Sequence, residues 1–380
     1  MSTTKTRIFL SPPHMGGTEL SYIKKVFESN YIAPVGPAID KFETEMATIL
    51  DIPFTVAVSS GTAAMHLAVR HLEIGPGDVV LASTLTFIGS VAPVIYQGGE
   101  LWFIDSDHKT WNMDPQLLAE ALEECIKKTG KPPKAIIPTD IYGNCVDLDA
   151  INKVSNKYNI PVIVDSAESL GSTYKGKSAG KGGYASVYSF NGNKIITTSS
   201  GGLLASEDQA LINHAKKLAT QAKDPMPYYH HTEIGYNYRM SNVLAAIGLG
   251  QLQVLNDRVK RCREINRLYK TCLKDVDGLS FMPEPSYGIS NCWLTVILID
   301  PQICKKGPEA LRIALEAQNI ESRRVWKPMH MQPVFAQNRI IGGLIAERLF
   351  ETGLCLPSGT SMTNSEVEFV AETIKRTLAA

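Results

Sequence analysis

The chain has 380 residues, of which 44% are hydrophobic and 20% are charged, and 38 basic side chains balance 38 acidic ones. This length fits a large α/β domain with a smaller one, and a net charge of zero gives no general attraction to nucleic acid or to an anionic membrane. The seven cysteines lack CxxC spacing, which indicates free thiols rather than a disulfide framework or a zinc site.

Apolar segments along the chain are short. The first 17 residues contain no long apolar run, and the later apolar stretches have the length of strands. This pattern predicts neither a signal peptide nor a membrane-spanning helix. We therefore expect a cytoplasmic protein.

The first two-thirds of the chain alternates β-branched runs with amphipathic segments. Candidate strands lie at residues 54–58, 79–83, 101–104, 134–138, 161–165, 185–190 and 202–206. Helical patterns at 62–72, 114–128 and 147–158 separate the earlier strands. Strands joined through helices favour a parallel sheet covered on both faces. Because no helix separates the last two strands, we expect a mixed, mostly parallel sheet of seven strands.

The pattern changes from about residue 240. Apolar residues at helical spacing predict one long helix there, and helices of this kind commonly connect two domains. Gly248 and Gly250 are the expected position of a bend, because glycine weakens a helix. We place the domain boundary inside this helix, near residue 250.

The remainder of the chain predicts a smaller α+β unit. A strand is expected at 291–299 and a helix at 307–318. Together with the boundary inside the long helix, this gives a large domain at 1–250 and a small C-terminal domain at 251–380.

Two segments at the ends of predicted strands carry residues that suit a phosphorylated ligand. Ser60, Gly61 and Thr62 open a helix, where free backbone N–H groups and the helix dipole attract anions. The same residue types also cap helices that bind nothing. Asp165 ends a buried strand, where ligands of α/β sheets bind, although it could serve only as a helix cap.

Lys194 follows in a stretch rich in Asn, Gly, Ser and Thr. It is either an exposed loop lysine or a Schiff-base lysine, whose neutral amine attacks an aldehyde. Pyridoxal phosphate (PLP) needs a lysine at its aldehyde carbon, a carboxylate at its ring nitrogen and donors around its phosphate, for which Ser189 is a further candidate. Because the phosphate turn, Asp165 and Lys194 occur in a consistent order at strand ends, the sequence predicts a PLP site and no metal site.

These motifs resemble those of the PLP-dependent sugar aminotransferases of the DegT/DnrJ/EryC1/StrS group, which have the fold type I architecture. The resemblance covers about residues 8–376 and rests on SGTAA, VDSAESLGSTYKGK, SFNGNKIITTSSGG, GYNYRMSN and RRVWKPMH. The strings FLSPPHMGGTE and FNGNKIITTS are similar to the subgroup of 4-aminotransferases that act on UDP-4-keto-6-deoxy-N-acetylglucosamine.

The resemblance implies a role for each matched residue. Lys194 would bind the cofactor and carry the proton, and Asp165 would keep the ring nitrogen protonated. The residues expected to contact the cofactor are Gly61, Thr62, Phe87, Asp165, Glu168, Ser189 and Asn237, the last from the neighbouring subunit of a homodimer with shared active sites. The residues expected near the nucleotide sugar are Trp326, His330 and Arg239, for which core packing or a surface charge is the alternative.

Three positions depart from the pattern of the group. Asp140 stands where the family often has His, Ser166 where many members have Ala, and Ser200 where the subgroup usually has Gly. These departures bear on the pose of the substrate rather than on the cofactor. A sister branch carries His in place of the lysine and dehydrates sugars, so Lys194 argues against that reaction.

The expected reaction is a ping-pong transfer of an amino group from L-glutamate to C4 of a UDP-linked 4-keto-6-deoxy sugar, UDP-2-acetamido-2,6-dideoxy-hexos-4-ulose. Such a product serves amino-sugar biosynthesis for surface glycans or protein glycosylation. One alternative is amination of a dTDP- or GDP-linked keto sugar at C3 or C4. Another is a non-catalytic protein of the same fold that acts as a sensor or scaffold.

Overall fold

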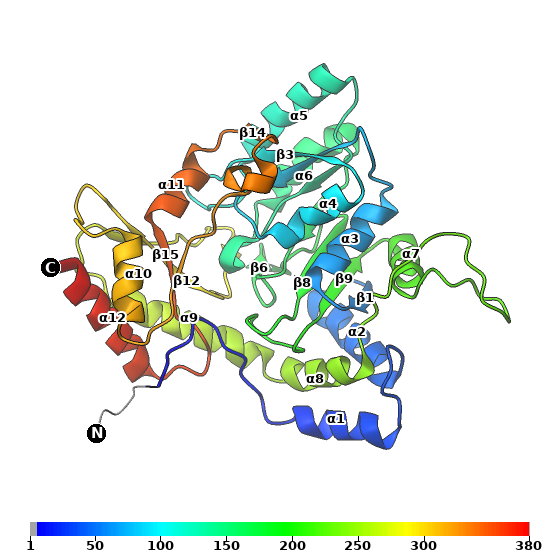
Figure 1. Ribbon diagram of the computed structural model, residues 1–380, viewed down its shortest axis with the longest axis horizontal. Coiled ribbons are helices and arrows are strands. Elements are labelled where there is room, and N and C mark those ends of the chain that lie inside the picture. Colours follow the sequence, from blue (N-terminus) through cyan, green and yellow to red (C-terminus); the bar gives the residue numbers. More distant parts are fainter. Residues whose placement is uncertain (1–5, 380) are drawn as a thin grey trace.

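A mixed β-sheet with helices on both faces forms the larger part of the computed structural model, which describes residues 6–379 (Figure 1). The strand order is β1-β9-β8-β5-β4-β2-β3-β14, with β4 and β5 joined through bridges at Ile136–Val162 and Thr139–Asp165. All of these strands run parallel except β9. The strands are β1 (Phe54–Val58), β2 (Val79–Ser83), β3 (Glu100–Ile104), β4 (Ala135–Ile137), β5 (Ile163–Asp165), β8 (Ala185–Ser189), β9 (Gly202–Ser206) and β14 (Arg339–Ile341).

The expected mixed, mostly parallel sheet is confirmed, but it has eight strands rather than seven. The eighth strand, β14, pairs in parallel with β3 at the edge of the sheet. Its three residues carry little periodicity, and they lie outside the first two-thirds of the chain, where the alternation of strands and helices indicated the other strands. The range 251–380 therefore contributes to the large sheet as well as to the C-terminal unit.

Apolar side chains of the sheet are buried on both faces, as the alternation of strands and helices predicts. Val80 and Ala82 pack with α3 on one face, whereas Val79 and Leu81 pack with α5 on the other. The first face is covered by α3 (Gly61–His71), α4 (Ala92–Tyr96) and α7 (Gln209–Ala219). The second face is covered by α2 (Pro37–Leu50), α5 (Pro115–Thr129), α6 (Leu148–Ser155) and α8 (Asn242–Leu252).

A second, antiparallel sheet has the order β10-β12-β15-β13. Its strands are β10 (Leu279–Phe281), β12 (Thr295–Ile299), β15 (Gly353–Leu356) and β13 (Arg323–Arg324). The helices α9 (Leu255–Cys272), α10 (Pro308–Glu316) and α12 (Asn364–Ala379) pack on it. Ile8 forms a bridge with Ile320, which brings the N-terminal segment to this side of the molecule.

Short elements complete the described chain. A third small sheet consists of β11 (Gly288–Ile289), β6 (Thr173–Tyr174) and β7 (Lys177–Ser178). The remaining helices are α1 (Glu19–Glu28) and α11 (Leu344–Thr352), with single 3-10 turns η1 (Ile88–Ser90), η2 (Ile141–Gly143), η3 (Asn156–Tyr158), η4 (Met329–Met331) and η5 (Pro333–Phe335). Within residues 6–379, no helix combines the length and the apolar character that crossing a membrane requires.

The long helix expected from about residue 240 is two helices. α8 ends at Leu252 and α9 begins at Leu255, with Val254 outside the helical region at φ −111° and ψ 5°. The two glycines lie inside α8 and do not mark the break. A Cβ atom on Gly248 would lie 2.6 Å from the Phe42 ring, and one on Gly250 would lie 2.9 Å from the Glu19 Cα atom. The glycines therefore permit α8 to contact α2 and α1 closely.

We expect the substitution Gly250→Ala to lower the free energy of unfolding by about 1–2 kcal/mol. Overpacking against the α1 backbone costs roughly 1–3 kcal/mol, and the better helix propensity of Ala returns at most about 1 kcal/mol. Denaturant unfolding measures the change. The control is Gly75→Ala, where the nearest atom to a new Cβ lies 4.0 Å away. A Gly250→Ala protein as stable as the wild type would contradict this account of the helix contact.

Candidate active site

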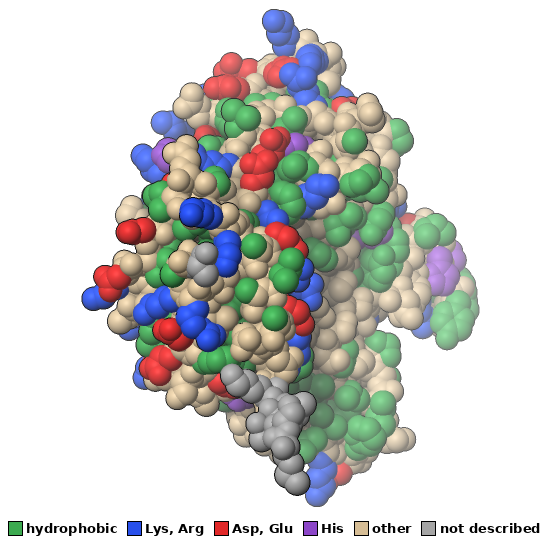
Figure 2. All heavy atoms as spheres, turned by 60° about the vertical axis from the view of Figure 1, so that its left-hand side comes forward, with side chains coloured by type: hydrophobic (Ala, Val, Ile, Leu, Met, Phe, Trp, Pro, Cys, Tyr) green, Lys and Arg blue, Asp and Glu red, His purple; other side chains and the backbone are tan. Residues whose placement is uncertain are grey.

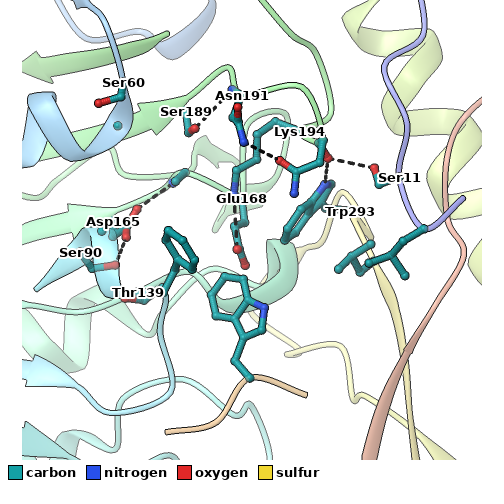
Figure 3. Close-up of a pocket in the computed structure, with 18 of the residues that line it drawn as sticks. Ser11, Ser60, Ser90, Thr139, Asp165, Glu168, Ser189, Asn191, Lys194 and Trp293 are labelled. Atoms are coloured by element: carbon teal, nitrogen blue, oxygen red, sulfur yellow. Dashed lines mark hydrogen bonds and ion pairs between the residues drawn. The ribbon is translucent and has the colours of Figure 1, made fainter. Parts of the chain in front are cut away.

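A cavity of about 810 Å³ lies at the carboxyl ends of β5 and β8, beside the N-terminus of α3. Its wall combines the large sheet with residues 9–13 and with part of the antiparallel sheet. The sequence-predicted residues that line it are Gly61, Thr62, Phe87, Asp165, Glu168, Ser189, Lys194 and Trp326. Figure 3 shows Asp165, Glu168, Ser189 and Lys194 around a shared space.

The amine of Lys194 is held inside this cavity. Its Nζ atom lies 3.5 Å from Oε1 of Glu168 and 4.3 Å from the centre of the Trp293 ring (Figure 3). The indole N–H of Trp293 donates to the Asn193 carbonyl at 2.7 Å, and the Ser11 hydroxyl donates to the same oxygen at 2.9 Å. These contacts fix the loop between β8 and β9, so Lys194 is not a free surface lysine.

Asp165 is a buried carboxylate at the end of β5. One oxygen accepts from the Ala167 N–H at 3.0 Å, and the other accepts from the Ser90 hydroxyl. Ser90 is itself linked to Thr86, whose Oγ1 lies 2.7 Å from the Ser90 Oγ. Burial raises the pKa of Asp165 above its ordinary value, against the opposing effects of Ser90, Ala167 and Lys194.

Glu168 occupies the space between Lys194 and the η2 turn. Its Oε2 atom accepts from the Tyr142 N–H at 2.7 Å. Tyr142 has φ 50°, a left-handed conformation that aims this N–H at the carboxylate. Burial raises the pKa of Glu168 to about 7, against the lowering effect of the Lys194 charge. Glu168 can therefore hold or release a proton beside the lysine near neutral pH.

Two of the unusual residues, Asp140 and Ser166, form one buried cluster. Oδ2 of Asp140 accepts from the hydroxyls of Ser166 at 2.8 Å and Ser169 at 2.6 Å, and Oδ1 accepts from the Val146 N–H at 2.9 Å. Burial raises the pKa of Asp140 to about 6. The two departures are therefore linked, because the Ser166 hydroxyl donates to the buried Asp140 carboxylate. Ser200, the third departure, donates to the Ser59 carbonyl at 2.8 Å.

The N-terminus of α3 offers free donors to an anion. The Ser60 hydroxyl accepts from the Ala63 N–H at 3.0 Å, whereas the N–H groups of Gly61 and Thr62 donate to no other described residue. A Cβ atom on Gly61 would lie 3.3 Å from the Ser189 Cβ, so a side chain here would crowd Ser189 at the end of β8. A phosphate group fits these donors.

Three sequence-predicted residues do not line the cavity. The buried Arg239 pairs with Glu43 and donates to the Ala57 carbonyl at 2.9 Å. His330 lies 2.6 Å from the Thr84 Oγ1 and 3.0 Å from the Glu347 carboxylate. Other side chains already engage both groups within the chain, and the contacts of Arg239 and His330 with the sugar stay predictions. Asn237 is exposed and lies outside the cavity of its own chain.

The comparisons with known proteins agree with this geometry. The family described as DegT/DnrJ/EryC1/StrS aminotransferases matches residues 13–375. The chain belongs to this aminotransferase family. It is 46% identical to EpsN of Bacillus subtilis (strain 168), named as a pyridoxal phosphate-dependent aminotransferase, over 97% of the chain and 95% of the relative. It is 35% identical to the GDP-perosamine synthase of Escherichia coli O157:H7, over 95% of the chain and 96% of the relative.

Solved structures extend the likeness. The aminotransferase TlmJ from Streptoalloteichus hindustanus is 29% identical and matches with a TM-score of 0.91, over 98% of the chain and 99% of that structure. The protein is thus a PLP-dependent aminotransferase with the fold of its family. When bound, PLP supplies an aldehyde for the incoming amine and a ring that withdraws electrons. The free N–H groups of α3, the buried Asp165 and the enclosed amine of Lys194 fit its phosphate, ring nitrogen and aldehyde.

Several residues of this aminotransferase site could not be found from the sequence. Ser90 supports Asp165, and Trp293 and Ser11 support the lysine loop. Ser90 stands three residues after Phe87, which was predicted to contact the cofactor, and this closeness in the sequence could have suggested that Ser90 lies at the site. Trp293 and Ser11 belong to segments far from Lys194 in the chain, so no local pattern connects them to it.

We expect the stability of the cofactor-free protein to report the proton on Glu168. The native state holds this proton up to a pKa of about 7, whereas the unfolded state releases it near the ordinary value of 4.5. The stabilising contribution is therefore complete below pH 4.5 and is lost as the pH rises to 7. Gln cannot ionise, so the Glu168→Gln protein does not lose this contribution. As the pH rises from 4.5 to 7, its unfolding free energy should therefore increase relative to that of the wild type by up to about 3 kcal/mol.

Denaturant unfolding at a series of pH values measures this difference. Asp140 titrates in both proteins, so its contribution cancels. The control is Glu207→Gln, at an exposed glutamate, for which no such pH-dependent gain is expected. A difference between Glu168→Gln and the wild type that does not change with pH would show that folding does not raise the pKa of Glu168.

Proposed function

We propose that the enzyme transfers an amino group from L-glutamate to C4 of a UDP-linked 4-keto-6-deoxy sugar, UDP-2-acetamido-2,6-dideoxy-hexos-4-ulose. The observation that carries the proposal is the enclosed amine of Lys194 between Glu168 and Trp293, with Asp165 in the same cavity. A volume of about 810 Å³ suits a substrate larger than an amino acid. The subgroup-like strings FLSPPHMGGTE and FNGNKIITTS support the UDP-linked sugar.

The side chains of the cavity divide the work of this reaction. Lys194 carries the proton between the α-carbon of the donor and C4′ of the cofactor. Glu168, 3.5 Å from the Lys194 Nζ, balances its charge as the proton moves. Asp165 holds a positive charge at the ring nitrogen, which favours loss of the proton at carbon. Because Trp293 and the residues around Lys194 limit access of water, these charges act strongly.

Two aromatic rings line the cavity together with these charged residues. The rings of Phe87 and Trp326 have their centres 5.6 Å apart, and 59% of Phe87 is exposed. We assign the Phe87 ring to stacking on the cofactor and Trp326 to contact with the sugar. Flat apolar surfaces of this kind complement the rings of both ligands.

A GDP-linked keto sugar is the second candidate substrate. The relative that is 35% identical over nearly the whole chain is named a GDP-perosamine synthase, and this observation favours that nucleotide. The chemistry assigned to Lys194 is the same for either substrate. A dTDP-linked sugar, or amination at C3, completes the set of alternatives.

The proposal includes a homodimer in which each active site receives residues from both subunits. It also includes a cytoplasmic location. Asn237 lies outside its own cavity, which supports a role at the phosphate site of the partner subunit. Exposed apolar side chains occur on the segment just before it, at Tyr228, Tyr229 and Ile234. Figure 2 shows hydrophobic side chains on the lobe that projects from the molecule, and such surfaces often form interfaces. The seven free cysteines suit a reducing compartment.

Incubation of the enzyme with PLP, L-glutamate and the UDP-4-keto sugar should yield an amino sugar and 2-oxoglutarate. We expect Lys194→Ala to abolish turnover, because the proton carrier and the amine that binds the cofactor are both lost. Mass spectrometry of the sugar and an assay of 2-oxoglutarate measure the reaction. The control is Lys157→Ala, at an exposed lysine.

Competition between nucleotides separates the candidate substrates. Inhibition by UDP but not by GDP or dTDP supports the UDP-linked sugar. If GDP inhibits and UDP does not, the UDP assignment is wrong and the second candidate replaces it. If none of the keto sugars yields either product, the proposed function fails.

Shared active sites predict complementation between two inactive variants. In a mixed dimer of Lys194→Ala and Asn237→Ala chains, one site receives both wild-type side chains. Co-expression should therefore restore roughly one quarter of wild-type activity, because random pairing makes half of the dimers mixed and half of their sites intact. Steady-state activity of the co-purified protein checks this. Activity no greater than that of Asn237→Ala alone would place Asn237 outside the partner's site.

A further inference from the structure

Charged side chains on the cavity wall include few cations. Among the described lining residues, the acidic ones are Asp165, Glu168 and Glu321, and the basic ones are Lys194 and Arg323. Lys194 is the reacting amine and already faces Glu168. In this described lining, Arg323 is therefore the cation that remains for an anionic substrate.

The position of Arg323 on β13 directs it to the cavity. Neighbouring residues of a strand point to opposite sides, and Arg324 turns away to donate to the carbonyls of Phe350 and Glu351 at 2.5 and 2.9 Å. Arg323 pairs in register with Cys355 of β15, which also lines the cavity. Its side chain is 70% exposed, so a ligand can reach it.

Glu321 orients the guanidinium group of Arg323 without using all of its donors. The Oε1 atom accepts from Nε and Nη2 of Arg323 at 3.3 and 3.0 Å, and Oε2 accepts from the Leu10 N–H at 3.0 Å. The Nη1 group of Arg323 donates to no other described residue. Because arginine has five N–H donors in a plane, the guanidinium group keeps free donors for a ligand.

We propose that Arg323 is a shared anion anchor, an inference that rests on the proposed function. Its guanidinium binds a carboxylate of L-glutamate in one half-reaction and the diphosphate of the nucleotide sugar in the other. The two substrates of a ping-pong reaction use the same cavity in turn, and both are anions. A planar guanidinium pairs with carboxylate and phosphate groups through two parallel hydrogen bonds, so one residue can serve both.

The test compares Arg323→Ala and Arg323→Lys with Arg312→Ala. Arg312 lies on α10 and also pairs with a glutamate, Glu309, at 2.7 Å, so it is a matched control. In Arg323→Ala, KM for L-glutamate and KM for the keto sugar should both rise about 10-fold or more, with kcat nearly unchanged. Arg323→Lys keeps the charge but not the planar fork, so its KM values should lie between. Thermal unfolding establishes that each variant is folded.

A binding readout without the sugar completes the test. Inorganic pyrophosphate should compete with L-glutamate in the first half-reaction of the PLP-loaded enzyme, followed by the absorbance of the cofactor, and Arg323→Ala should weaken this inhibition about 10-fold. Unchanged inhibition, or a rise in KM for only one substrate, would overturn the shared anchor. Because this half-reaction uses no sugar, the anchor can fail while transamination stands. Absence of amino-sugar formation by the wild type refutes the proposed function instead.

Discussion

The burial of three neighbouring carboxyl groups, two of them beside Lys194, imposes the constraint that shapes the site. Burial is the largest influence on the pKa values of Asp140, Asp165 and Glu168, and it raises all three. A carboxylate taken out of water loses several kcal/mol of hydration unless other donors replace the water. The protein supplies backbone N–H groups from turns and the hydroxyls of Ser90, Ser166 and Ser169, which all lie outside the strands. The ends of β4 and β5 are where these donors converge.

The same constraint accounts for local features that otherwise look unrelated. Tyr142 adopts an unfavourable left-handed conformation because its N–H is the donor for Glu168. The hydroxyls of Ser166 and Ser169 both donate to the Asp140 carboxylate, so the three side chains form one hydrogen-bonded unit. A substitution that removes one member of this unit leaves the others buried without a partner, which costs more than the hydrogen bond itself.

Local patterns predicted the features that depend on local physics. Runs of β-branched residues identified seven of the eight strands of the large sheet, and strand ends located Asp165, Lys194 and the turn at Gly61. Features that depend on distant segments were missed or misplaced. Arg239 looked available, but its partner Glu43 is 196 residues away. Gly248 and Gly250 predicted a bend in one long helix, whereas they lie inside α8 and permit close helix packing. Such partners are set by tertiary contacts, which no sequence window contains.

The strand β14 has a consequence for how the two sheets can evolve. It belongs to the C-terminal range but covers the outer edge of β3 in the large sheet (Figure 1). A chain cut near residue 250 would leave that edge with unpaired backbone groups, which recruit strands from other molecules. An exchange of residues 251–380 between relatives would therefore replace an edge strand of the large sheet as well as the antiparallel sheet and its helices. Recombination that respects the fold must carry the edge of the large sheet along with them.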